Sequence, residues 1–321
     1  MISDPAFIRS NSRPAPRHGP ALGPTHRLLG RFHVTGVFWY RFAYWAFTRL
    51  PPWTEWVIVT VFTTFFFLAL GRIRGALASN LEPVLGPAGR WESLRRSYRT
   101  LWAFAWCFTE RYRRLAAPER FSATIDGEEH WRQVMEGTGG VVLVTAHVGP
   151  WENATHVGAS NSPRRIHIVR EKEIDPRAQQ FTQELLSRSG NTFITHFAGE
   201  ELSLALELAN ALRAGDVVAL QCDRPREGGR TIVVSLFGRP MPLPTGPAAL
   251  ARAAHVPILP VFNFRDGRFR GRSVVRAPIW VPRTSDRDAD VADATNRLAA
   301  EIEWAIRQRP HQWFCFRRLW E

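Results

Sequence analysis

The chain has 321 residues, of which 45% are hydrophobic and 22% are charged, close to the usage of ordinary globular proteins. This composition excludes a disordered chain, a collagen and a polytopic membrane protein, and the length is enough for about two domains. The excess of 42 basic over 29 acidic residues gives a net charge of +13, which favours nucleic acid, anionic lipid, a phosphorylated substrate or an acidic protein as partner.

Residues 1–30 are rich in proline, arginine, serine and glycine, with Asp4 as their one acid. Such a segment buries too little apolar surface to offset its ordering entropy, so we expect a flexible basic tail. This segment does not resemble a secretory signal peptide, because no apolar run follows Met1. The three cysteines of the chain have neither metal nor redox spacing, and their odd number argues for a reducing compartment.

Residues 31–118 are expected to form a membrane-associated helical region. Aromatic side chains alternate with arginines over 34–50, which is typical of a helix that lies in the headgroup layer. An uncharged run follows at 56–71, and as a helix it spans ~24 Å against the ~30 Å of a hydrocarbon core. We therefore expect a monotopic helix that enters one leaflet, with a tilted single span and a buried core helix as alternatives. Residues 91–113 have the apolar periodicity of an amphipathic helix.

From residue 119 to 321 strand patterns alternate with helix patterns. The expected strands are 121–126, 141–146, 165–169, 217–221, 231–236, 257–264 and 272–277, and the expected helices are 128–136, 175–189, 199–214, 245–255 and 288–308. The run VVLVTA at 141–146 is continuously apolar, as in a strand buried on both faces of a parallel sheet. The sequence thus predicts an α/β domain with a mostly parallel central sheet flanked by helices.

His147 stands just past the end of this buried strand, where ligand sites of open α/β sheets gather. Glu152 follows five residues later, and a turn between them can bring its carboxylate onto the imidazole. Such a pair is a general-base unit, in which the carboxylate fixes the tautomer and the other ring nitrogen takes a proton. From this spacing alone, a satisfied structural His–Glu pair is the more frequent explanation of the pattern. The sequence places no serine or cysteine in a nucleophile-elbow motif, and its histidines and cysteines do not have the spacing of metal ligands. We therefore expect neither a covalent enzyme intermediate nor a metal.

Further polar residues stand at the ends of later strands. Arg170 ends the next strand, and Asp223 with Arg224 follows another. Each has an ordinary reading as a solvated charge or a turn residue. As site residues, the arginines suit phosphate or carboxylate, and Asp223 suits either the sugar hydroxyls of a substrate or support of the catalytic pair.

Taken together, these segments resemble the bacterial lipid A late acyltransferases (lauroyl/myristoyl transferases) of the lysophospholipid acyltransferase superfamily, to which phosphatidylinositol mannoside acyltransferase is related. The resemblance covers residues 35–320. It is carried by the segments Asn80-Leu81, AHVGPWE at 146–152, Arg170, Asp223-Arg224, FGRPMPLPTGPAALA at 237–251, and PHQW at 310–313 with Arg317-Arg318.

The resemblance implies a membrane-associated enzyme that transfers a fatty acyl group from acyl carrier protein or acyl-CoA to a hydroxyl of a glycolipid. It implies His147 and Glu152 as the catalytic pair, no cofactor beyond the donor substrate, and a position on the cytoplasmic face of the inner membrane. The basic surface then binds anionic lipid and an acidic carrier protein. Two alternatives stay open: a hydrolase that passes the acyl group to water, and a non-enzymatic protein that binds membranes or nucleic acid.

Overall fold

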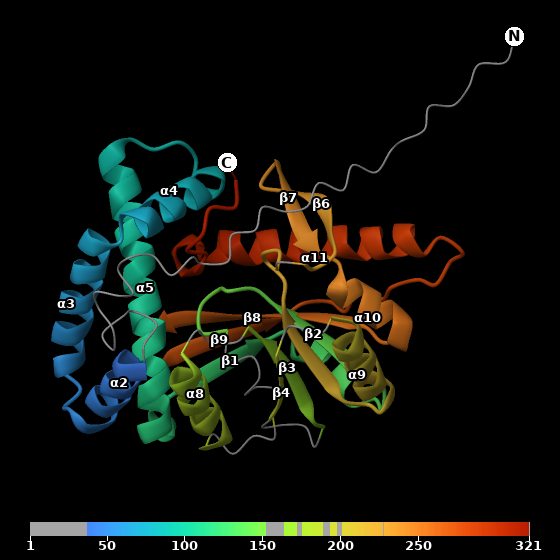
Figure 1. Cartoon of the computed structure of the whole chain (residues 1–321), viewed down its shortest axis with the longest axis horizontal. Helices are drawn as coiled ribbons and strands as arrows, with labels where there is room; N and C mark the ends of the chain where they lie inside the picture. The colour runs from blue at the N-terminus through green and yellow to red at the C-terminus, as the bar shows by residue number, and fades with distance from the viewer. Residues whose placement is uncertain are drawn as a thin grey trace, which may run out of the picture.

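The computed structural model describes residues 37–151, 164–171, 175–188, 193–197, 201–226 and 228–320. The expected basic tail at 1–30 lies outside these residues. Seven strands form one sheet in the order β1-β9-β8-β2-β5-β3-β4 (Figure 1). Their bounds are β1 Ser122–Asp126, β2 Val141–Thr145, β3 Ile166–Arg170, β4 Phe193–Phe197, β5 Val217–Gln221, β8 Ile258–Gly267 and β9 Arg270–Val275. All neighbours run parallel except β8 and β9, which are antiparallel. The predicted mostly parallel sheet is confirmed.

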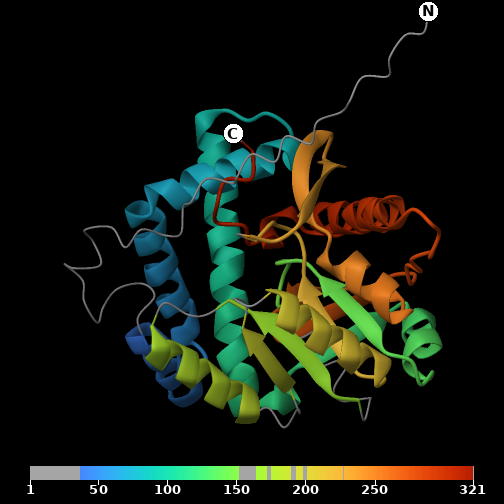
Figure 2. The ribbon, with the colours of Figure 1, turned by 45° about the vertical axis from the view of Figure 1, so that its right-hand side comes forward.

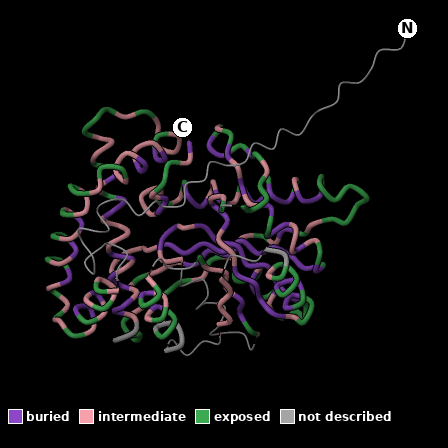
Figure 3. Tube along the Cα trace, viewed as in Figure 1, coloured by how far each residue is buried: buried purple, intermediate pink, exposed green. Residues whose placement is uncertain are grey.

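Strand β2 lies at the centre of the sheet and is buried along its whole length. Val142 and Val144 face a core cluster with helices α9, α10 and α11, whereas Val141 and Leu143 face a second cluster with α6. The bounds of these helices are α6 Glu128–Met135, α9 Glu201–Arg213, α10 Gly246–Ala254 and α11 Arg287–Gln308. The continuous apolar run of the sequence is therefore explained by helices on both faces of the sheet (Figure 3).

Two strands were not expected from the sequence. Strand β4 lies at the edge of the sheet and includes the polar Thr195 and His196, which hide its pattern. Strand β7 at Arg239–Pro244 pairs with β6 at Thr231–Leu236 in a separate hairpin. Three prolines in β7 argue against a strand in a central sheet, but a two-stranded hairpin has only edges and tolerates them.

Four helices cover one side of the sheet, α2 at Val37–Arg49, α3 at Thr54–Ala69, α4 at Gly71–Leu85 and α5 at Arg90–Ala116 (Figures 1 and 2). Buried Glu55 joins them to the sheet, since it accepts hydrogen bonds from Arg113 Nε at 2.6 Å and from Arg268 at 2.8 Å. These contacts link α3, α5 and the turn between β8 and β9.

Among the described helices, none is by itself long and apolar enough to cross a membrane. Helices α3 and α4 are long and apolar enough only when they are taken together, and the chain bends by 91° at the break between them. Helix α3 nonetheless leaves a row of large apolar side chains exposed: Trp53, Trp56, Val57, Val61, Phe65 and Leu68.

Candidate active site

The sheet brings His147 and Asp223 to the same level. Strands β2 and β5 are parallel neighbours in which Thr145 pairs with Gln221, and each of the two side chains comes two residues later. The Cys222 amide still donates to the Thr145 carbonyl, at 3.2 Å, so the ladder continues past the strand ends. A shared register thus positions both residues at the carboxyl edge of the sheet, where binding sites of this architecture form.

A short hydrogen bond joins the two side chains. His147 Nδ1 lies 2.6 Å from Asp223 Oδ1, and Trp313 Nε1 donates to Asp223 Oδ2 at 3.0 Å. Asp223 is completely buried. Burial alone would raise the pKa of this carboxyl, but His147, Arg224 and the Trp313 hydrogen bond outweigh it and hold the pKa well below its usual range. Asp223 is therefore an ionised acceptor, and the Nδ1 atom of His147 carries the proton.

Arg224 contacts the other nitrogen of the same ring, with its guanidinium 2.7 Å from His147 Nε2. A guanidinium only donates hydrogen bonds, so Nε2 is here the acceptor. Both contacts select the same state of the imidazole, with a proton on Nδ1 and a lone pair on Nε2. That is the state a general base needs.

The turn that carries His147 is held by the C-terminal segment of the chain. The Phe314 amide donates to the His147 carbonyl and the Gly149 amide donates to the Gln312 carbonyl, both at 2.8 Å. Gly149 has φ of +57°, and a Cβ there would lie 2.2 Å from the Asn263 carbonyl oxygen, so the turn requires glycine. The segment positions two parts of the site at once, because the adjacent Trp313 also binds Asp223.

Asn80 of α4 fixes this C-terminal segment in turn. Its amide donates to the carbonyls of Cys315 at 3.1 Å and Arg317 at 2.7 Å, and its oxygen accepts from the Leu319 amide at 3.1 Å. Asn80 and the segment 310–318 were singled out from the sequence through the resemblance alone. The structure gives them a physical task, since they anchor the support of the His147 turn.

The structure therefore brings together three of the five residues expected at the site: His147, Asp223 and Arg224. Arg170 ends β3 and lines a cavity beside Trp151, whose ring centroid is 5.4 Å from that of His147. Glu152 lies outside the described residues, and its pairing with His147 stays a prediction. Trp313 was singled out only as part of the PHQW segment of the resemblance, and its role was missed because a buried indole that donates to a carboxylate leaves no spacing pattern.

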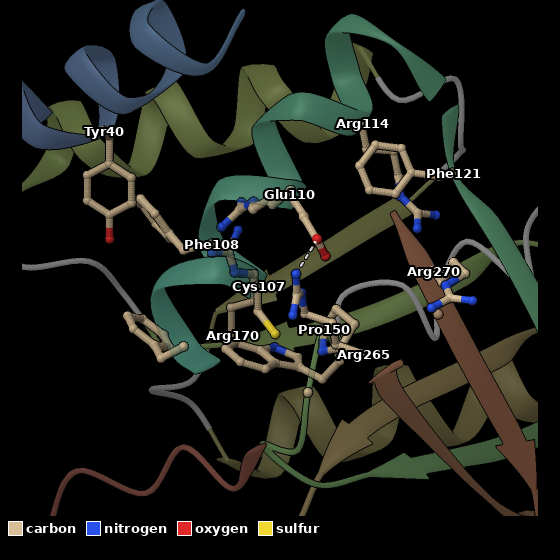
Figure 4. A pocket seen from close by; sticks show the side chains of 15 residues that line it. Tyr40, Cys107, Phe108, Glu110, Arg114, Phe121, Pro150, Arg170, Arg265 and Arg270 are labelled. Carbon is tan, nitrogen blue, oxygen red and sulfur yellow. Dashed lines mark hydrogen bonds and ion pairs between the residues drawn. The ribbon is translucent and has the colours of Figure 1, made fainter. Parts of the chain in front are cut away.

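The cavity beside Trp151 has a volume of about 210 Å³ and is strongly basic (Figure 4). Its arginines come from α5, from the end of β3 and from the β8–β9 hairpin. They are Arg111, Arg114, Arg170, Arg265 and Arg270. Of these, the sequence analysis had proposed only Arg170 as a site residue.

A second cavity, of about 380 Å³, is apolar and lies among α2, α3 and α5. The side chains of Tyr40, Phe104 and Phe108 line both cavities, so the two meet there. Phe104 also contacts Phe314, whose ring neighbours Trp151. A path of aromatic side chains thus leads from the apolar cavity to the His147 turn.

Comparisons with known proteins show which family the chain belongs to. Residues 30–321 match the family model described as bacterial lipid A biosynthesis acyltransferase. The chain is 28% identical over 264 residues to phosphatidylinositol mannoside acyltransferase of two Mycobacterium tuberculosis strains, CDC 1551 and H37Rv, covering 76% of each chain. A solved 1-acyl-sn-glycerophosphate acyltransferase from Thermotoga maritima is 14% identical with a TM-score of 0.34, covering 77% of this chain and 97% of that one. Since the family model spans nearly the whole chain, the protein is a member of the bacterial lipid A biosynthesis acyltransferase family and an acyltransferase.

Proposed function

We propose that this acyltransferase moves a fatty acyl group from a thioester of acyl carrier protein or coenzyme A to a hydroxyl of a glycolipid. The observation that carries the proposal is His147, whose Nδ1 proton is held by ionised Asp223 and whose Nε2 lone pair accepts from the Arg224 guanidinium. This base lies beside a basic cavity that shares three lining side chains with an apolar one, which suits an acyl thioester and a lipid hydroxyl.

In the proposed reaction, the acceptor hydroxyl replaces Arg224 at His147 Nε2. As its oxygen attacks the thioester carbonyl, its proton passes to Nε2, and Asp223 stabilises the imidazolium that forms. The tetrahedral intermediate collapses with breakage of the carbon–sulfur bond, and the leaving thiolate takes the proton from Nε2. The products are an ester and a free thiol, and the base is restored.

Direct attack by the acceptor fits the chemistry of the cysteines. Burial raises the pKa of the thiols of Cys107, Cys222 and Cys315, so none of them is a ready thiolate nucleophile. The acyl group then passes from donor to acceptor in one displacement, without a covalent enzyme intermediate.

We assign Arg224 to the developing oxyanion. Its guanidinium now touches Nε2, and once the acceptor hydroxyl displaces it, it lies beside the reacting carbonyl. We expect Arg224→Gln to lower kcat by about 10²–10³, the usual effect of removing one oxyanion donor. An unchanged kcat in this variant would contradict the assignment. Glu152 stays a prediction, as the residue that the resemblance implies to orient His147.

The acyl chain is proposed to occupy the apolar cavity among α2, α3 and α5. Its walls are aromatic and aliphatic, and Tyr40, Phe104 and Phe108 connect it with the basic cavity. Substituting Ala105, which lines it, by Trp fills part of this space. We expect that variant to prefer shorter acyl donors than the wild type, and an unchanged preference in a series of acyl-CoA lengths would exclude this cavity as the chain site.

Helices α2 and α3 are proposed to dock the enzyme on one leaflet at the cytoplasmic face of the inner membrane. Trp56, Val61 and Phe65 form an exposed apolar row on α3, and Arg41 and Arg49 of α2 are exposed nearby in the chain. An apolar face edged by arginines suits an anionic bilayer surface, at about 1 kcal/mol per arginine.

The docking proposal predicts that the triple variant W56S/V61S/F65S loses most of its binding to anionic liposomes in a sedimentation assay. Trp280, which is also exposed, lies after β9 and away from these helices, so Trp280→Ser is the matched control. Full sedimentation of the triple variant, or an equal loss in the control, would contradict the proposal.

The acceptor is tested most directly in vitro. Purified enzyme is incubated with acyl-CoA or acyl carrier protein thioester, with and without phosphatidylinositol mannoside or a lipid A precursor, and the products are read by mass spectrometry. We expect thiol release that depends on acceptor, with an acylated glycolipid as product. Release at the full rate without acceptor would indicate a hydrolase instead. Lipids from a deletion strain then identify the natural acceptor by the acyl chain they lack.

A further inference from the structure

The basic cavity beside the His147 turn has more positive charge than its walls neutralise. Among the described residues that line it, five are arginines and Glu110 is the single acid. Glu110 is engaged already, since Arg265 donates to it at 2.9 Å and the Phe269 amide donates to it at 3.2 Å (Figure 4). Glu110 is thus already paired with Arg265, and the described lining holds no second acid for Arg114 and Arg270.

Two of these arginines form no salt bridge with an acidic residue in the described part of the chain, although Glu110 acts on Arg114 electrostatically. The Arg114 guanidinium stacks over the Phe121 ring, 4.6 Å from its centroid, and forms no salt bridge or hydrogen bond with the described residues. Arg270 is exposed, and its side chain likewise forms no salt bridge or hydrogen bond with them. Burial lowers the pKa of Arg114, partly offset by Glu110, which reflects the cost of holding this cation away from water.

Arg265 supplies an independent observation. Its Nε atom is buried and finds no hydrogen-bond partner among the described residues, although its terminal nitrogen binds Glu110. Buried donors are rarely left unsatisfied, because an unmade bond of this kind leaves the desolvation of the donor uncompensated. A ligand oxygen in the cavity is one way to relieve that cost.

From these observations we propose that the cavity binds a phosphate group of a substrate, with Arg114 and Arg270 as its principal contacts and Arg265 in support. Guanidinium groups bind tetrahedral oxyanions through two parallel hydrogen bonds, and the 210 Å³ volume admits a phosphate and its ester link. The site deepens the proposed function, and its substrate assignment rests on it.

Two substrates of the proposed reaction contain phosphate, the coenzyme A or carrier-protein arm of the donor and the phospholipid acceptor. The chemistry of recognition is the same for both. We therefore propose a phosphate subsite that either substrate can fill. Whether the donor or the acceptor supplies the phosphate is decided by experiment.

The first experiment needs no catalysis. Inorganic phosphate is titrated into purified wild-type protein by calorimetry, in parallel with the variants Arg114→Gln and Arg270→Gln. We expect each variant to bind phosphate about tenfold more weakly, since a charge-assisted hydrogen bond is lost. Arg297→Gln, at an exposed arginine of α11, is the matched control and should bind as wild type does. Thermal melting shows whether each variant is folded, and exposed Arg270 keeps the test valid if Arg114→Gln is not.

The second experiment identifies the source. We expect Arg270→Gln to raise the KM of one substrate about tenfold with a smaller change in kcat. If the rise is seen with acyl-CoA and vanishes with acyl-pantetheine, which lacks phosphate, the donor fills the cavity. If it is seen in the KM of the phospholipid acceptor with either donor, the acceptor fills it. No phosphate binding to the wild type, or equal binding by the variants, would overturn the inference. Phosphate binding without any acyl transfer would instead refute the proposed function.

Discussion

Replacing Asp223 by asparagine tests how the His147 base is held. The wild-type carboxylate accepts two hydrogen bonds, from His147 Nδ1 at 2.6 Å and from Trp313 Nε1 at 3.0 Å. An amide has a single oxygen. Because the indole N–H is a fixed donor, the asparagine oxygen turns to Trp313 and its NH₂ faces Nδ1, which must then give up its proton.

This change places the imidazole proton on Nε2, the atom that has to accept a proton from the acceptor. To recover the reactive tautomer, the amide must turn its NH₂ toward the indole N–H, and that unmatched buried pair costs about 1–3 kcal/mol. The variant also lacks the negative charge beside the imidazolium in the transition state. In serine proteases the same substitution lowers kcat about 10⁴-fold, so we expect a loss of about 10³–10⁴ here, or about 4–5.5 kcal/mol.

The assay is the initial rate of thiol release at saturating donor and acceptor, together with ¹⁵N NMR of labelled histidine, which distinguishes the two tautomers. Asp216 provides the matched control, because it accepts from His167 Nε2 at 3.1 Å at the other end of β5. We expect Asp216→Asn to keep its kcat. A kcat within about tenfold of wild type for Asp223→Asn, in a folded protein, would refute the tautomer argument.

Three further outcomes are expected. Trp313→Phe removes one hydrogen bond to the buried Asp223 carboxylate, so chemical denaturation should show a free energy of unfolding lower by about 1.5–3 kcal/mol. An unchanged free energy of unfolding would show that this bond contributes nothing. Gly149→Ala forces a Cβ against the Asn263 carbonyl, so the His147 turn shifts and kcat falls by about 10² or more, whereas a normal kcat would mean that the turn adapts. His311, whose pKa burial and Arg99 lower to about 4, stays neutral in the fold while the unfolded chain takes up its proton near pH 6.5. Stability therefore falls as the pH drops from about 6.5 to about 4, and this fall should be smaller in His311→Gln; equal falls would contradict the assignment.

The sheet and the reactive histidine were predictable because their signals are local. All five residues of β2 are buried and the first four are apolar, and His147 comes two residues after the strand ends. Asp223 and Arg224 follow β5 in the same way. Their meeting depends on β2 and β5 being neighbours in register, which the sequence does not encode in any spacing.

The support of the site was harder to predict because it comes from distant parts of the chain. Trp313 reaches Asp223 across 90 positions, and Asn80 holds the C-terminal segment across more than 230. The basic cavity likewise combines Arg114 of α5 with Arg270 of a hairpin. Each of these arginines has the appearance of a solvated charge in the sequence, and only packing reveals that they share one cavity.

The central claim is that His147 takes the proton of the acceptor hydroxyl. Single-turnover acyl transfer by purified His147→Ala, with donor binding measured in the same preparation, tests it most directly. The account predicts intact donor binding and a rate reduced by about 10²–10⁴, the range that a general base contributes. Transfer at nearly the wild-type rate would contradict it.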